Sequence, residues 1–237
     1  MAYDKVVDST VLEDGLTQIA DAIREKGGLG DLFTSPLTFP SGFASAVEGL
    51  SGGGATEPYV EETYDMYGNM TSAVMHGHSV VRSFAFYYQG ITSIELPDTV
   101  YRIENSAFYS CTKLTSIVLS ANLTTIDNQA FYDCLRLSQI SFPSQLGMID
   151  DQAFYGCTAL ESIIFPAMIK TINSMAFFKC KNLETVTFQG TPTGIASSAF
   201  SSCEKLTTIN VPWAEGAVAN APWGATGATI HYNVSGV

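Results

Sequence analysis

The chain has 237 residues, of which 46% are hydrophobic and 14% are charged, so a packed core is expected and a wholly disordered chain is excluded. Its formal net charge of −12 argues against a nucleic-acid backbone or an anionic membrane surface as a partner. No apolar run approaches the ~20 residues that span a bilayer, and no apolar stretch follows a basic start, so we expect neither a transmembrane helix nor a signal peptide.

The first 50 residues predict a small helical N-terminal segment. A helix is expected over residues 10–26, because its apolar residues fall on one face: Leu12, Leu16, Ile19, Ala20 and Ile23. A second short helix is expected over residues 42–50, with Ser41 as its N-cap. The glycine-rich residues 51–58 then predict a flexible linker, and the strand-like residues 59–80 are expected to cap the repeats that follow.

This leader resembles the N-terminal stretch of tail-associated proteins of phages and prophages from Gram-positive gut bacteria. The resemblance rests on residues 16–27 and 37–50. Residues 221–225 and 228–233 are also similar to the closing segments of such proteins. The resemblance implies that the module belongs to a phage or prophage tail, with its N-terminal helices attached to a tail-assembly partner.

Residues 81–212 contain an internal repeat of 23 residues. Five A-F-x-x-C segments begin at this spacing, and each is followed by a strand pattern of the L-x-x-I-x-[LF] type. A degenerate copy around Ile94 precedes them; its Ala85-Phe86 is one residue closer to its strand, and Tyr88 is expected in the cysteine column. One unit cannot bury its apolar side chains alone. We therefore expect about six coils that stack through short parallel β-strands, with each A-F-x-x-C segment forming a short helical or 3₁₀ turn.

Two columns of the repeat are expected inside this solenoid. They contain Phe108, Phe131, Phe154, Phe177 and Phe200, and Cys111, Cys134, Cys157, Cys180 and Cys203. We interpret the cysteines as buried thiols that fill a narrow space. The coil spacing also allows disulfides, although an odd number of cysteines cannot pair completely. A metal site is less favoured, because zinc needs four ligands around one point and a ladder spreads them along a line.

The repeats resemble the BspA-like class of leucine-rich repeat proteins. The A-F-x-x-C motifs and their strands carry this resemblance over residues 80–212. It implies a leucine-rich repeat solenoid of short parallel strands and turns, with a non-enzymatic role in adhesion or recognition at bacterial surfaces. Residues 213–237 are expected to form a C-terminal cap, in which Trp213, Trp223 and Ile230 cover the last coil.

The sequence contains none of the catalytic motifs G-x-S-x-G, H-E-x-x-H and G-x-x-x-x-G-K-[ST]. His76 and His78 would share one face of a strand, but two histidines without a third ligand do not predict a metal site. We therefore expect a protein that is not an enzyme, with no catalytic residue, no cofactor and no bound metal.

Two rows of side chains remain as candidate binding surfaces. The first is the small, polar and nearly uncharged outer side of the strands: Ser116, Val118, Gln139, Ser141, Ser162, Ile164, Thr185, Thr187, Thr208 and Asn210. The second consists of the residues that follow the ladder phenylalanines: Tyr109, Tyr132, Tyr155 and Phe178. Both rows also have a purely structural explanation, because Ser and Thr suit exposed strands and aromatic rings can stack on one another without a ligand.

Three functions follow from these features. The first is a recognition or adhesion module in a phage or prophage tail. The alternative is a bacterial cell-surface adhesin that binds proteins or glycans of the host or of neighbouring cells. The third is a structural spacer without a ligand. The expected ligand is an unidentified protein or glycan, whereas nucleic acid and membrane are not expected as partners.

Overall fold

The computed structural model describes residues 58–64 and 70–234. The helices expected over residues 10–26 and 42–50, and all of the expected linker except Pro58, lie outside these residues. Within the described residues the chain forms the strands β1 to β14 and no helix. These strands build a parallel β-solenoid of about seven turns, in agreement with the fold expected from the repeat.

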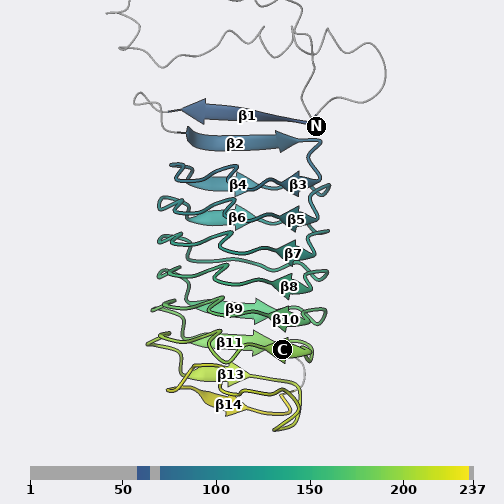
Figure 1. The fold of residues 1–237 in the computed structure, drawn as a ribbon, viewed down its shortest axis with the longest axis vertical. Coiled ribbons are helices and arrows are strands. Elements are labelled where there is room, and N and C mark those ends of the chain that lie inside the picture. Colours follow the sequence, from purple (N-terminus) through teal and green to yellow (C-terminus); the bar gives the residue numbers. More distant parts are fainter. Residues whose placement is uncertain (1–57, 65–69, 235–237) are drawn as a thin grey trace, which may run out of the picture. The chain divides into compact units, whose positions relative to one another are not determined.

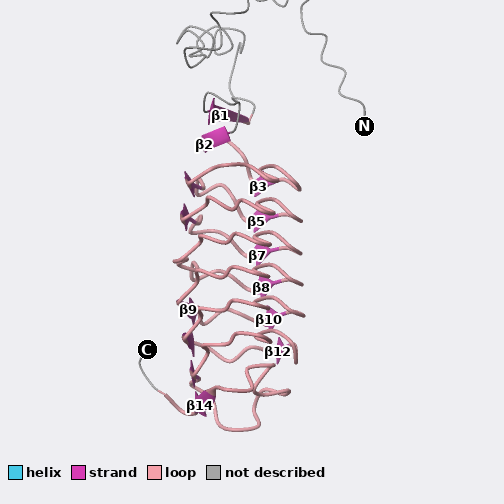
Figure 2. Ribbon diagram, turned by 90° about the vertical axis from the view of Figure 1, so that its left-hand side faces the viewer, coloured by secondary structure: helices cyan, strands magenta, loops and turns pink. Residues whose placement is uncertain are grey.

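The solenoid has two walls of short parallel strands, which lie on opposite sides of each coil (Figure 2). One wall is a continuous six-stranded sheet of β3 (Val80–Val81), β5 (Arg102–Ile103), β7 (Thr125–Ile126), β8 (Met148–Ile149), β10 (Thr171–Ile172) and β12 (Gly194–Ile195). The other, which we call the strand face, contains β4 (Ser93–Glu95), β6 (Ser116–Val118), β9 (Ser162–Phe165), β11 (Thr185–Phe188), β13 (Thr208–Asn210) and β14 (Thr229–His231).

The register of both walls places equivalent residues of successive coils side by side. On the strand face, for example, Val186 pairs with Ile163 and Ile209. Apolar columns of the repeat therefore stack on themselves, as the 23-residue period predicts. The strand face is interrupted at one coil, because only an isolated bridge between Ser116 and Gln139 connects β6 to the next turn. The strand pattern of residues 137–142 predicted a regular strand there, and the structure has none.

The A-F-x-x-C segments form successive turns instead of the expected helical or 3₁₀ turn. Alternate amides bond within a coil and between coils: the Tyr109 N–H donates to the Ser106 carbonyl (3.2 Å), and the Phe108 N–H donates to the Ala130 carbonyl of the next coil (2.7 Å). This alternation gives Ser106 and Ser110 positive φ angles of 55° and 54°. Hydrogen bonds between coils therefore also tie the third side of the solenoid, although it contains no strand.

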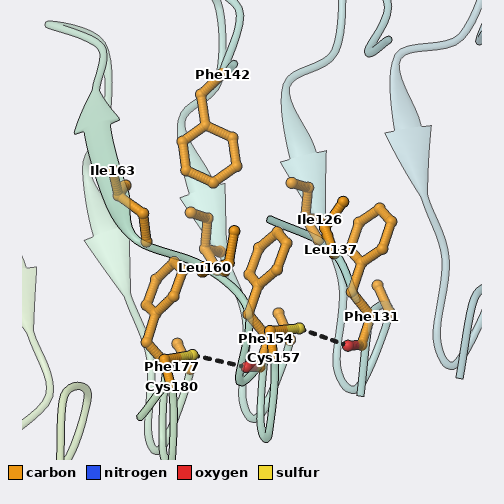
Figure 3. Packing of buried hydrophobic residues seen from close by; sticks show 14 of the residues in the cluster. Ile126, Phe131, Leu137, Phe142, Phe154, Cys157, Leu160, Ile163, Phe177 and Cys180 are labelled. Atoms are coloured by element: carbon orange, nitrogen blue, oxygen red, sulfur yellow. Dashed lines mark hydrogen bonds between the residues drawn. The ribbon is translucent and has the colours of Figure 1, made fainter. Parts of the chain in front are cut away.

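A continuous apolar core lies between the walls (Figure 3). Phe131, Phe154 and Phe177 are fully buried, and their rings stack with centroids 5.0 and 5.1 Å apart. Leu137 and Leu160 pack beside them. Each fully buried side chain of this size contributes about 1.5–3 kcal/mol through the hydrophobic effect, so the stacked coils gain a core that one coil alone does not have.

Residues outside the repeat pack against both ends of the solenoid. At one end, β1 (Tyr59–Tyr64) and β2 (Met70–His76) form an antiparallel hairpin, and the Thr92 N–H donates to the Thr71 carbonyl of β2 (Figure 1). At the other end, β14 pairs with β13. The rings of Trp213 and Trp223 lie 5.2 and 6.2 Å from that of Phe188 there, both tryptophans are buried, and Ile230 is partly buried.

Candidate functional site

The cysteine column is a ladder of free, buried thiols. Each thiol donates a hydrogen bond to the carbonyl of a ladder phenylalanine in a preceding coil; for example, the Cys157 Sγ lies 3.1 Å from the Phe131 oxygen (Figure 3). Burial raises the pKa of the Cys134 and Cys180 thiols well above the ordinary value. The thiols therefore stay protonated at neutral pH and serve packing and hydrogen bonding, and the structure does not form the disulfides that remained an alternative.

The described residues offer little for metal chemistry. Within residues 58–64 and 70–234, no group of three or more His, Cys, Asp or Glu side chains could hold a metal ion. His76 instead lies beside Glu61 of the neighbouring strand, with its Nε2 3.5 Å from the Glu61 Oε1. No helix in this part of the chain is long and apolar enough to cross a membrane.

The strand face presents most of its predicted residues to solvent. Ser116, Gln139, Ser141 and Ser162 are exposed and Thr185 is half-buried. Thr187 is the exception, and its prediction as an exposed residue is wrong: only 5% of it is accessible. Its register partners Ile164 and Asn210 flank it, and the Asn210 amide donates to its hydroxyl at 3.3 Å. Neighbouring side chains thus cover this position.

Two residues of the predicted outward row are exposed aliphatic side chains. Val118 is 57% exposed and Ile164 is 53% exposed, each at the equivalent position of its coil. The intervening coil has Ser141 at that position, which is also exposed. The outward position of the strand pattern placed both residues on this face, but the sequence alone did not show that they would stay exposed whereas Thr187 would not.

The aromatic row lies on the side of the solenoid formed by the A-F-x-x-C turns. Tyr109, Tyr132, Tyr155 and Phe178 are half-buried and stack in sequence, with ring centroids 4.6, 4.5 and 5.0 Å apart. Burial raises the pKa of Tyr132 to about 12. The Lys179 ammonium lies 5.4 Å from the centroid of the Tyr155 ring. Because the rings cover one another's faces, the row offers mainly ring edges and hydroxyls to a ligand.

The row begins in an aromatic cluster that sequence reasoning missed. We define the first-coil cluster as Phe84, Tyr87 and Tyr88, which are 55%, 39% and 64% exposed. Tyr87 stacks on Tyr109 at 5.1 Å and so extends the row by one ring. The sequence register was misleading here, because the first coil is one residue shorter than the others. Gln89 and not Tyr88 therefore aligns with the cysteine column.

Comparison with known proteins gives one family and several solved structures. The family described as BspA type Leucine rich repeat region matches residues 79–212 in six copies. None of the curated proteins compared with the chain matches it.

Among solved structures, the leucine-rich repeat protein TpLRR of T. pallidum is similar, with 26% identity and a TM-score of 0.54, over 64% of this chain and 81% of that one. A leucine-rich repeat protein from Bacteroides ovatus has 25% identity and a TM-score of 0.52, over 68% of this chain and 47% of its own. The pneumococcal vaccine antigen PcpA shares the fold at 20% identity and a TM-score of 0.57, over 69% of this chain. This chain spans 47% of the Bacteroides ovatus protein and 42% of PcpA, which is less than half of each.

Proposed function

The chain belongs to the family of BspA type leucine-rich repeat proteins, and from this premise we propose that it is a non-enzymatic recognition module whose strand face binds a cell-surface ligand. The single observation that carries the proposal is the exposure of Val118 and Ile164 on a wall of mostly polar side chains, where the exposed Glu95 is the register partner of Val118. Large aliphatic side chains that remain exposed at repeated positions are typical of an interaction surface.

The strand face combines two exposed apolar side chains with hydrogen-bonding neighbours. Covering the exposed halves of Val118 and Ile164 with a partner would contribute about 0.8–1.5 kcal/mol for each side chain. The hydroxyls of Ser116, Ser141 and Ser162 surround them and can donate or accept hydrogen bonds at the rim. The strands are held in register by the coils on either side, so little conformational entropy is lost when a partner binds.

We propose a phage or prophage tail as the place where the module acts. The support is the resemblance of residues 16–27 and 37–50 to tail-associated proteins, and these residues lie outside the described part of the chain. The alternative, a bacterial cell-surface adhesin, is supported by the BspA-like repeat. Detection of the protein in purified phage particles supports the tail, whereas its removal by protease from intact cells supports the surface adhesin.

The test of recognition is binding of the labelled full chain to intact bacteria, compared with the double variant Val118→Ser and Ile164→Ser. We expect the double variant to bind about tenfold more weakly, since two apolar anchors are removed. Met168→Ser is the matched control, because Met168 is 50% exposed but lies in the turn after β9. A wild-type chain that binds no cells, or a double variant that binds as well as the wild type, contradicts the proposal and favours the spacer.

A further inference from the structure

The first-coil cluster leaves aromatic ring surface open to solvent. Phe84 and Tyr88 each meet Tyr87 edge to face, at interplanar angles of 71° and 73°. Tyr87 in turn stacks on Tyr109, so its position is fixed by the aromatic row. Phe84 and Tyr88 are more than half exposed, whereas the aromatic residues of the row in the later coils are half-buried, and Tyr88 also contacts Tyr109 with centroids 5.8 Å apart.

The backbone at this cluster adopts a conformation that bulky residues usually avoid. Phe84 and Tyr88 have positive φ angles of 62° and 58°. The equivalent positions of the next coil are occupied by Ser106 and Ser110, with φ angles of 55° and 54°. Left-handed backbone is unfavourable for a large side chain and is tolerated mainly by small or polar residues. Later coils have positive φ angles at the same positions, Met175 and Lys179 among them, so this backbone belongs to the turn, and the first coil differs in placing two aromatic rings on it.

The size of the cluster favours a small ligand. From the exposed fractions, the three rings present roughly 300 Å² of surface. A stable protein interface needs about 800 Å² on each partner, so the cluster cannot hold a protein on its own. One or two sugar rings, in contrast, fit a surface of this size.

The chemistry of the cluster selects among small ligands. A pyranose ring has an apolar face of C–H groups and a rim of hydroxyls, and the negative face of an aromatic ring attracts such C–H groups. The Tyr87 and Tyr88 hydroxyls can donate and accept hydrogen bonds at the rim. None of the three residues carries a charge, so the cluster itself supplies no ion pair to an anionic sugar.

We infer that the first-coil cluster of Phe84, Tyr87 and Tyr88 binds a neutral pyranose unit of a glycan by stacking on its open aromatic faces. The inference rests on the proposed recognition function and specifies the chemical class of one ligand.

The test uses the full chain on a panel of immobilised neutral oligosaccharides that contain glucose, galactose, mannose or N-acetylglucosamine. We expect the wild type to bind at least one of them and the double variant Phe84→Ser and Tyr88→Ser to bind it about tenfold more weakly. Serine occupies both equivalent positions of the next coil, so the variant should fold. Tyr101→Ser is the control, because Tyr101 is 49% exposed and directly precedes β5 of the six-stranded wall, outside the first-coil cluster.

Two results overturn the inference. In one, the wild type binds no oligosaccharide of the panel; in the other, the double variant binds as tightly as the wild type. The cell-binding assay with the Val118 and Ile164 variant separates the two proposals. If cell binding depends on those residues while no neutral sugar binds, the recognition function stands and the glycan site does not.

Discussion

Replacing Phe154 by alanine should lower the free energy of unfolding by about 4–5 kcal/mol. The side chain is fully buried, which accounts for about 1.5–3 kcal/mol of transfer energy. Its ring also stacks on Phe131 at 5.0 Å and on Phe177 at 5.1 Å and meets Phe142 edge to face at 5.7 Å, and each aromatic pair adds about 0.5–1.5 kcal/mol. The Phe154 N–H donates to the Ala176 carbonyl of the next coil at 2.7 Å, so the coils cannot close easily around the cavity.

Equilibrium denaturation in urea, followed by circular dichroism, measures this loss. Phe86→Ala is the matched control, because Phe86 is only 2% exposed but stands at the end of the ladder and stacks on Phe108 alone. The control should lose about 2 kcal/mol less, since two ring pairs are missing. An equal or smaller loss at Phe154, with an unchanged dependence on urea concentration, would refute the argument that rings on both sides stabilise the middle coils.

Two further predictions concern the backbone and the thiols. Gly190→Ala should lower the free energy of unfolding by about 1–3 kcal/mol, because a Cβ there would collide with the backbone of Ala167. Gly194→Ala is the control: no atom lies within 4 Å of an added Cβ, so the free energy of unfolding should stay unchanged or rise by up to ~1 kcal/mol. Equal urea midpoints for the two variants would contradict this prediction. Alkaline pH should destabilise the fold, because burial raises the pKa of the thiols in the folded state, so that the unfolded chain releases protons above about pH 8.5 that the folded chain keeps. The free energy of unfolding should therefore be constant from pH 6 to about pH 8 and then fall by up to ~1.4 kcal/mol per pH unit for each such thiol, and urea curves that coincide at about pH 7.5 and pH 10 would contradict the shift.

The repeat made the interior of this protein predictable. A 23-residue period places the same residue type at the same position of every coil, and the walls observed in the structure pair these positions. The buried phenylalanines and cysteines follow from this, because each coil has coils of nearly identical sequence above and below it. The helices expected in the leader are a separate matter, since they lie outside the described residues.

Prediction was weaker where a position depends on its neighbours in other coils. Thr187 has the strand pattern of an exposed residue, but Ile164 and Asn210 of the adjacent coils cover it. The A-F-x-x-C segment was expected to form a short helical or 3₁₀ turn. In the structure every second amide donates to a carbonyl of the next coil, and the sequence of one coil does not show this pairing.

The amino-acid sequence by itself determined the 23-residue period, the parallel stacking of the coils and the residues of the core, because these depend on a pattern that each coil repeats. Only the tertiary structure decided which outward side chains stay exposed and how the first coil aligns with the second. There the coil is one residue shorter, which brings Phe86 onto Phe108 and leaves Phe84, Tyr87 and Tyr88 at the surface. The physical reason is that exposure and register at the end of a solenoid depend on contacts between unlike coils, which no single repeat encodes.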